Sequence, residues 1–196
     1  MTLTVTGPVS SRTFRVLWLL EELGLEYEHR VEMPHSDAVN ALNPLRQVPI
    51  LQDDDAVLTD SLAILHYLSD REARFTYPVG TPERAHMEAR INFVLTEIEA
   101  PLWMRGRHSY VLPEDMRHPE IFPILDRDIK MAEKKFARLL GDAEFLAGNE
   151  FTVADIVAGH VAGWAAGQNL VDDGGPLATY FGQLKSRPAW VRGRKD

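Results

Sequence analysis

Two adjacent serines, Ser10 and Ser11, follow a Gly-Pro pair and stand directly before a strongly patterned helical segment. Hydroxyl groups donate hydrogen bonds, and the free amides at the start of a helix attract anions. The pair therefore suits a site that stabilises an anion. The alternative interpretation is that both serines only cap the helix.

The chain contains no cysteine, which excludes a C-x-x-C redox centre and any mixed disulfide formed by the protein itself. Seven histidines are present, but no two of them lie three or four residues apart. The sequence therefore predicts no helical metal pair, and we expect no metal site. Glycine-rich phosphate-binding motifs and the GxSxG motif are also absent from it.

The serines are positioned by a predicted β-α-β unit. Residues 3–5 alternate like a short strand, residues 16, 19, 20 and 23 form one apolar helix face, and Gly24 is placed to end that helix. Residues 27–31 alternate again, which favours a parallel pair with a right-handed crossover. A loop with a short helix is expected over 34–47, followed by a β-hairpin whose apolar runs, 48–51 and 56–58, flank an acidic turn at 53–55.

A helix is expected to begin near Asp60, and a linker rich in Pro and Gly covers residues 74–80. Everything beyond the linker reads as helical. Thr81 is the predicted N-cap of the next helix, and a second helix covers about 121–140. Thr152 and Asp155 match a capping box at the start of a third helix, and a last helix spans about 177–185.

Composition limits the partners of the chain. It has 196 residues, of which 45% are hydrophobic, and a formal net charge of −8. This acidity argues against a nucleic-acid partner, because that affinity comes from Lys and Arg. The longest uncharged run, residues 156–171, is too short to span a bilayer, and no signal peptide is recognisable. We expect a cytoplasmic protein that binds neither nucleic acid nor membrane.

Four segments in this order resemble the cytosolic glutathione transferases: SSRTFRVLWLLEELGLEYE, NPLRQVPIL, LTDSLAILHYL and FLAGNEFTVADI. Within that family the chain resembles the bacterial, serine-type, theta- and zeta-like members. The resemblance implies an α/β plus all-α fold, with a thioredoxin-like glutathione-binding domain at 1–75 and a helical-bundle domain at 82–196. It also implies a homodimer, with a role in detoxification.

The activity implied by the resemblance is conjugation of glutathione, the co-substrate, to a hydrophobic small-molecule electrophile. The nucleophile is a thiolate, yet a free thiol with a pKa near ~8.5 is mostly protonated at neutral pH. One hydroxyl donor would lower that pKa by about one to two units. Because the substrate brings the sulfur, the protein needs a donor and no cysteine. By resemblance Ser10 is the first candidate for this catalytic donor and Ser11 the second.

The resemblance also implies a binding site for glutathione. Val48 and Pro49 match a cis-proline turn whose backbone pairs with the cysteinyl part, and Gln47 is expected at the glycyl end. Ser61 is expected to hold the γ-glutamyl carboxylate and Asp60 the ammonium. The alternatives are a trans proline on an edge strand, a solvated Gln47 and an ordinary Asp N-cap.

Four side chains in the segment 102–110 are candidates for binding the electrophile, in a pocket expected between the two halves: Trp103, Met104, Arg107 and Tyr110. Aromatic and thioether groups suit an apolar substrate, and a guanidinium suits a polar leaving group. The alternative is a partly exposed helix end whose cations complement the helix dipole. Two rival functions also remain open: a non-catalytic binding or regulatory protein, and a glutathione-dependent isomerase or dehalogenase.

Overall fold

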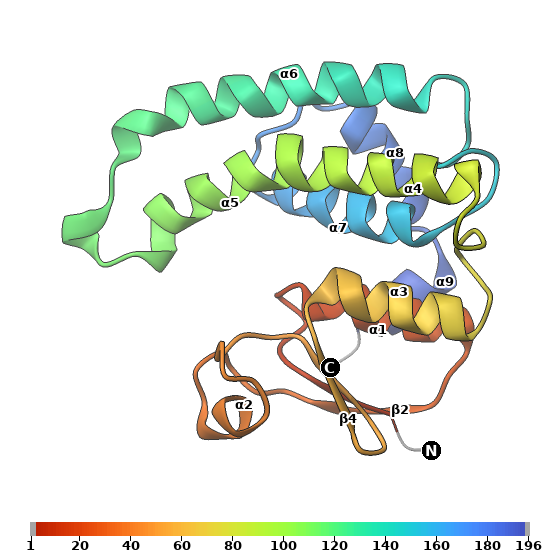
Figure 1. The fold of residues 1–196 in the computed structure, drawn as a ribbon. Helices are drawn as coiled ribbons and strands as arrows, with labels where there is room; N and C mark the ends of the chain where they lie inside the picture. The colour runs from red at the N-terminus through yellow and green to blue at the C-terminus, as the bar shows by residue number, and fades with distance from the viewer. Residues whose placement is uncertain (1–2, 195–196) are drawn as a thin grey trace. The chain divides into compact units, whose positions relative to one another are not determined.

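A computed structural model describes residues 3–194 of the chain, which form two compact units (Figure 1). Residues 3–78 and 185–194 make the first unit, and residues 79–184 make the second. The sequence analysis assigned the C-terminal segment to the helical domain, whereas the structure places residues 185–194 in the first unit. The reason is that the short helix α9 (Pro188–Arg192) packs on α1 (Thr13–Leu23).

The first unit is built on a four-stranded mixed sheet. Its strands are β1 (Leu3–Thr6), β2 (Tyr27–Arg30), β3 (Ile50–Asp53) and β4 (Ala56–Thr59), in the order β2-β1-β3-β4. β1 and β2 are parallel with Leu3 opposite Tyr27, while β3 is antiparallel to both of its neighbours. The predicted β-α-β start, the hairpin and the thioredoxin-like fold class are therefore confirmed.

The hairpin begins later than predicted. The apolar run was expected to start at Val48, but β3 starts at Ile50. Pro49 has no N–H to donate to a ladder, so regular pairing follows it. Asp53 pairs with Ala56, which leaves a two-residue turn.

Helices α1 and α3 (Ser61–Arg71) lie along the same face of the sheet, and α2 (Asp37–Leu42) forms the short helix expected after β2 (Figure 1). The apolar face predicted for α1 is fully or almost fully buried. Gly24 ends α1 at φ 73°, a left-handed conformation that glycine adopts readily, and its N–H donates to the Leu20 carbonyl. This unit therefore buries the core that the helical periodicity predicted.

The second unit is helical. One long helical stretch comprises α4 (Pro82–Phe93), the π-helical segment η1 (Val94–Glu99), α5 (Ala100–Gly106) and a second π-helical segment, η2 (Arg107–Val111). Two short 3₁₀ turns, η3 (Glu114–Met116) and η4 (Pro119–Ile121), lead into α6 (Phe122–Leu140), and α7 (Val153–Gly167) and α8 (Pro176–Leu184) complete the unit. The Thr81 hydroxyl accepts a hydrogen bond from the Arg84 N–H at 3.2 Å, which confirms the predicted cap.

The start of α7 carries the predicted capping box. Asp155 accepts hydrogen bonds from the Thr152 N–H at 2.6 Å, from the Leu146 N–H at 2.7 Å and from the Tyr180 hydroxyl. Burial raises the pKa of the Asp155 carboxyl, even though these donors favour its ionised form. The cluster ties three segments of the second unit together and is a folding element. No helix within residues 3–194 has both the length and the apolarity needed to cross a membrane.

Candidate functional site

The two serines lie in the turn between β1 and α1, but neither occupies the N-cap position. The helix begins at Thr13, and Arg12 at the N-cap makes no side-chain capping hydrogen bond within the described residues. Ser11 Oγ lies 2.8 Å from the Pro8 carbonyl oxygen, 2.8 Å from Thr13 Oγ1 and 3.1 Å from the Thr13 backbone N. The Ser11 hydroxyl proton is thus used within the turn that joins β1 to α1. The same hydroxyl links Pro8, at the start of this turn, to Thr13, the first residue of α1.

Ser10 differs from its neighbour. It is exposed, and its hydroxyl makes no hydrogen bond within residues 3–194. A hydroxyl in this state can donate to a ligand without breaking an internal contact. Of the two predicted donors, the structure therefore leaves Ser10 available and commits Ser11 to the fold.

The Val48-Pro49 peptide bond is cis, the isomer that the resemblance implied, and not the trans alternative. Close to it lies Gly7, which has φ 136°, and a Cβ at this position would lie 2.2 Å from Thr13 Oγ1 and 2.8 Å from Val48 Cβ. Only glycine tolerates both the conformation and this close approach. Gly7 therefore allows the first turn of α1 and the cis-proline turn to meet.

The loop before this turn is held by a buried amide. Asn43 Nδ2 donates to the Gln47 carbonyl at 2.9 Å, and Asn43 Oδ1 accepts from the Leu45 N–H at 3.0 Å. Gln47 itself is exposed, so its side chain is presented to solvent. The backbone N–H and carbonyl of Val48 make no hydrogen bond within the described residues, which leaves a short free backbone edge at the turn.

The start of α3 contains the other predicted polar pair. Asp60 adopts φ 71° and is the N-cap, because its carboxylate accepts from the N–H groups of Leu62 and Ala63 at 2.9 and 3.0 Å. Ser61 is buried, and Arg15 Nη1 from α1 donates to its hydroxyl at 3.4 Å. Asp60 is thus an ordinary N-cap through its Oδ1 atom, and its second carboxylate oxygen is not used in capping. Ser61 lies beside a buried cation, which together with the helix dipole favours an anionic group at this end of α3.

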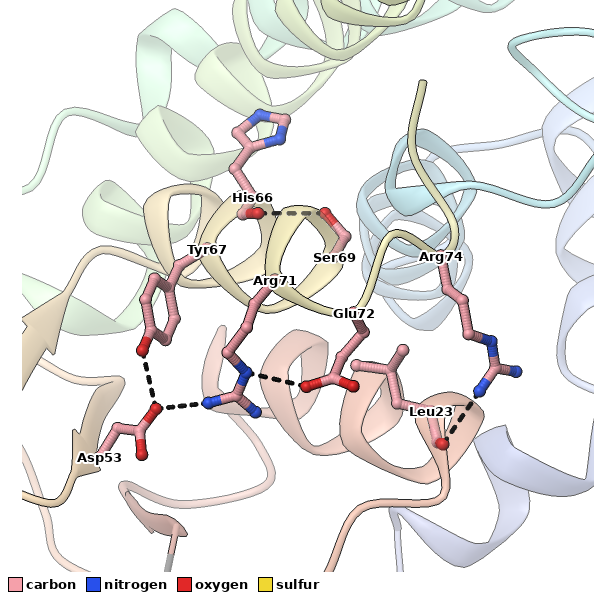
Figure 2. A network of polar contacts seen from close by, with 8 residues as sticks. All are labelled: Leu23, Asp53, His66, Tyr67, Ser69, Arg71, Glu72 and Arg74. Carbon is pink, nitrogen blue, oxygen red and sulfur yellow. Dashed lines mark hydrogen bonds and ion pairs between the residues drawn. The ribbon is translucent and has the colours of Figure 1, made fainter. Parts of the chain in front are cut away.

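The opposite end of α3 is anchored to the sheet by a polar network (Figure 2). The Tyr67 hydroxyl donates to Asp53 Oδ2 at 2.8 Å, and Arg71 pairs with the same carboxylate and with Glu72. The Arg71 guanidinium also lies 5.5 Å from the centre of the Tyr67 ring. These contacts join α3 to β3, and they hold the helix that carries Ser61 at its start.

In the second unit, aromatic side chains gather around Gly106. The Trp103 and Trp164 ring centres are 6.3 Å apart. A Cβ on Gly106 would lie 2.9 Å from the Tyr110 hydroxyl oxygen and 3.3 Å from Trp164 Cζ2. Glycine therefore leaves the space that these two side chains fill, while Trp103 and Tyr110 remain partly exposed. The π-helical segment η2 carries Tyr110, and such segments are frequent at functional sites.

The other two predicted side chains of this segment are not joined to that cluster. Met104 and Arg107 are half-buried, and within residues 3–194 neither side chain makes a hydrogen bond, ion pair or ring contact. The neighbouring Arg105, in contrast, pairs with Asp126 at 2.7 Å and stacks on Phe122. Of these two arginines, Arg107 is therefore the one whose guanidinium is left for a ligand in the described part of the chain.

Three residues of these clusters were missed by the sequence analysis: Thr13, Arg15 and Trp164. Arg15 had one visible signal, since it is a charged residue beside the apolar face of the predicted first helix. Thr13 had a weaker signal, as a hydroxyl at the helix start. Trp164 had none, because its contact with Gly106 joins helices far apart in the sequence.

Comparison with known proteins places these features in a family context. Residues 9–71 match the family model described as "Glutathione S-transferase, N-terminal domain". The chain is 32% identical to glutathione S-transferase theta-1 of Bos taurus over 132 residues, which is 63% of this chain and 54% of that protein. It is 27% identical to glutathione S-transferase GstA of Escherichia coli O157:H7 over 160 residues, which is 80% of this chain and 76% of the relative.

Solved structures show the same fold. The theta class glutathione S-transferase from Xanthomonas axonopodis pv. citri, solved with glutathione bound, matches with a TM-score of 0.80 and 25% identity and covers 99% of this chain and 97% of its own. The bacterial enzyme BphK, solved as a ternary complex, matches with a TM-score of 0.83 and 25% identity over 97% of this chain and 96% of its own. The chain spans about half the length of the bovine relative but nearly all of these two structures.

Proposed function

The chain belongs to the glutathione S-transferase family, and from this premise we propose that it binds glutathione in its first unit and transfers the thiolate to a hydrophobic electrophile. The observation that carries the proposal is that the cis-proline turn and the start of α3 both contact the first turn of α1. Gly7 brings Thr13 against Val48, and Arg15 reaches Ser61. Three segments that resemble glutathione-binding elements are thereby joined to one helix, in a chain that has no thiol of its own.

The proposed donor to the sulfur is Ser10. Its hydroxyl is exposed and uncommitted within residues 3–194, whereas Ser11 is held by Pro8 and Thr13. A hydrogen bond to a thiolate is charge-assisted and worth about 1.5–3 kcal/mol. It stabilises the anion and so lowers the pKa of the bound thiol toward neutral pH. Ser11 remains the second candidate and would have to release the Pro8 carbonyl to act.

Glutathione would lie along the free edge of the cis-proline turn. The N–H and carbonyl of Val48 would pair with the cysteinyl part like an added strand, with Pro49 shaping the turn and Gln47 facing the glycyl end. Ser61 and the first amides of α3 would hold the γ-glutamyl carboxylate. The Asp60 oxygen that is not used in capping would meet the ammonium.

The electrophile would bind in the second unit against the exposed rings of Trp103 and Tyr110, with Met104 beside them and Arg107 for a polar group. In the reaction the glutathione sulfur forms a bond to the electrophilic carbon. The bond to the leaving group breaks, and the leaving group departs with the electron pair. The thiol proton passes to solvent when the thiolate forms. A glutathione-dependent isomerase or dehalogenase would use the same thiolate, but the bond between sulfur and substrate would not remain in the product.

We also propose that the protein acts as a homodimer in the cytoplasm and that its role is detoxification. Family membership supports each of these. A non-catalytic glutathione-binding protein is the second candidate. It is favoured by the commitment of Ser11 to the Pro8 carbonyl, because only one hydroxyl of the pair is then available to the sulfur.

Calorimetry with glutathione and turnover of 1-chloro-2,4-dinitrobenzene test the proposal. We expect glutathione binding that Ser61→Ala weakens by about tenfold, as loss of a hydrogen bond to a charged group predicts. Chloride release should accompany formation of the conjugate. Absence of glutathione binding at millimolar concentration would refute the proposal, while binding without turnover of a panel of electrophiles would favour the non-catalytic function.

A further inference from the structure

The last described segment of the chain packs against the helix that begins at the proposed site. Residues 185–194 belong to the first unit, and α9 lies along α1. A Cβ on Gly193 would lie 3.3 Å from the backbone N of Trp18 and 3.4 Å from the backbone carbon of Leu17. The two backbones therefore approach closely just beyond α9.

Two ion pairs fasten this segment to the C-terminal half of α1. Arg187 donates to both carboxylate oxygens of Glu22, at 2.6 and 2.9 Å. The Glu22 side chain is only 9% exposed and also accepts from the Trp18 indole N–H at 3.0 Å. Arg192 pairs with Glu21 at 2.6 Å. The bidentate, largely buried pair has a fixed geometry, unlike an exposed salt bridge.

An aromatic cluster extends the contact to the first turn of α1. Trp190 meets Phe14 edge to face with ring centres 5.7 Å apart, and Phe14 stacks on Trp18 at 5.9 Å. The Arg194 guanidinium lies over two of these rings, at 5.3 Å from the centre of Phe14 and 4.8 Å from the centre of Trp190. Phe14 is only 3% exposed. Trp190 therefore provides part of the packing that fixes Phe14.

Phe14 lies between the two α1 residues that face the proposed site. Thr13 packs against Gly7 beside the cis-proline turn, and Arg15 donates to Ser61. The first turn of α1 has no N-cap side-chain hydrogen bond from Arg12 in the described part of the chain. Ser11 Oγ accepts from the Thr13 N–H instead, at 3.1 Å, and packing of Phe14 is a second constraint on this turn.

We propose that α9 is a positioning element of the glutathione site: Trp190, with Arg187, holds the first turn of α1 so that Arg15 reaches Ser61 and the preceding turn presents the Ser10 hydroxyl to the ligand. The inference rests on the proposed function. Neither residue touches the ligand, so both act through α1. Displacement of reacting groups by about 1 Å is enough to lower rates up to about a hundredfold.

The test compares Trp190→Ala with the conservative variant Trp190→Phe in the full chain. Hydrogen exchange of the Phe14 and Arg15 amides, which bond to the Ser11 and Arg12 carbonyls at 3.1 Å, is measured without ligand. We expect exchange about tenfold faster in Trp190→Ala, because these amides open when the first turn loosens. In Trp190→Phe a ring remains against Phe14, so most of the protection should return.

Glutathione affinity and the pKa of the bound thiol, followed by thiolate absorbance, are measured on the same proteins. Trp190→Ala should bind about tenfold more weakly and raise the thiol pKa, because the loosened start of α1 no longer holds the Ser10 turn toward the sulfur. The matched control is Tyr180→Phe in the second unit, which removes the hydroxyl bonded to Asp155. It should lower the melting temperature and leave glutathione affinity and the thiol pKa unchanged.

The outcomes separate the two hypotheses. If the unmodified protein binds glutathione and Trp190→Ala shows only the lower melting temperature of the control, then α9 is a stabilising element and the positioning role is wrong. If the unmodified protein does not bind glutathione, the proposed function fails and the positioning role falls with it. Faster exchange at Phe14, weaker binding and recovery in Trp190→Phe together support the proposal.

Discussion

The starts of α7 and α1 both carry hydroxyl side chains, yet the two helix starts are built differently. At α7, Thr152 and Asp155 cap each other, both are buried, and the carboxylate also accepts from the Leu146 N–H and the Tyr180 hydroxyl. At α1, the N-cap residue makes no such bond in the described residues, and Ser10 is exposed. At α7 every polar group of the cap is bonded within the protein, whereas at α1 Ser11 accepts from the Thr13 N–H and the neighbouring Ser10 hydroxyl is left to solvent.

This difference separates a folding element from the helix start that we propose to bind the ligand. A cap whose donors and acceptors are all satisfied internally stabilises the helix and has nothing left to offer a ligand. An open helix start keeps donors and a positive dipole end for an anion, and other contacts must then hold it in place. Substitutions at the two helix starts should therefore give opposite patterns of stability and activity.

The largest effect is expected for Asp155→Ala. The change leaves the N–H groups of Thr152 and Leu146 and the Tyr180 hydroxyl without their acceptor, in a buried position. Since each unsatisfied buried donor costs about 1–3 kcal/mol, loss of the acceptor for three donors should lower the free energy of unfolding by at least about 3 kcal/mol. Urea denaturation measures it. Glutathione affinity at a temperature where the variant is folded should not change, and a selective loss of affinity would contradict the comparison.

Ser10→Ala should give the reverse pattern. Loss of the donor should reduce the conjugation rate by about ten- to a hundredfold, the equivalent of about 1.5–3 kcal/mol of charge-assisted hydrogen bonding. The pKa of the bound thiol should rise, while the melting temperature stays the same because Ser10 makes no internal hydrogen bond in the described residues. Full activity of this variant would rule out Ser10 as the donor.

Ser11→Ala is the matched neighbour and should resemble a weak version of Asp155→Ala. Its hydroxyl lies 2.8 Å from the Pro8 carbonyl oxygen and accepts from the Thr13 N–H at 3.1 Å. Stability should fall by about 1 kcal/mol, with no change in the thiol pKa. Thermal unfolding measures the change in stability, and thiolate absorbance measures the thiol pKa. If the thiol pKa rose in Ser11→Ala and not in Ser10→Ala, Ser11 would be the donor to the sulfur and Ser10 would not.

The smallest effect concerns pH and the start of α8. The Glu133 carboxylate accepts from the Leu177 N–H at 3.3 Å, and burial raises the pKa of Glu133. The folded state then holds this proton to higher pH than the unfolded chain, whose Glu pKa is about 4.3. The free energy of unfolding should therefore fall as pH rises from about 4.3 through the raised pKa. In Glu133→Gln this slope should be smaller; an identical slope in urea titrations would exclude Glu133 as its source.

Local features of the fold were predictable because they depend on neighbours in sequence. The apolar face of α1, its end at Gly24, the Thr81 cap and the Thr152–Asp155 box all appear where expected. The start of β3 was wrong by two residues, because an apolar run does not reveal that Pro49 interrupts the ladder. The segment after residue 184 was assigned to the wrong unit, since polar and aromatic residues in a short terminal helix do not indicate what they pack on.

The candidate site was predictable only in part. Val48, Pro49 and Ser61 are binding residues by resemblance only, and the cis peptide bond that the resemblance implied, against a trans alternative, is present. The structure adds that Ser11 is occupied within its turn while Ser10 is not. The contact of Trp164 with Gly106 depends on helix packing within the second unit, for which the sequence offers no local signal.

By itself the sequence determined the order of the four strands and of the longer helices, the caps closed within a few residues, and the absence of a protein thiol, but not α9 or the π-helical segments. These properties follow from local periodicity and composition, which need no distant partner. Only the tertiary structure decided which serine is left open, that Arg15 reaches Ser61, and that α9 packs on α1. Such relations depend on the burial and close approach of residues distant in sequence, which arise only when the packed core brings them together.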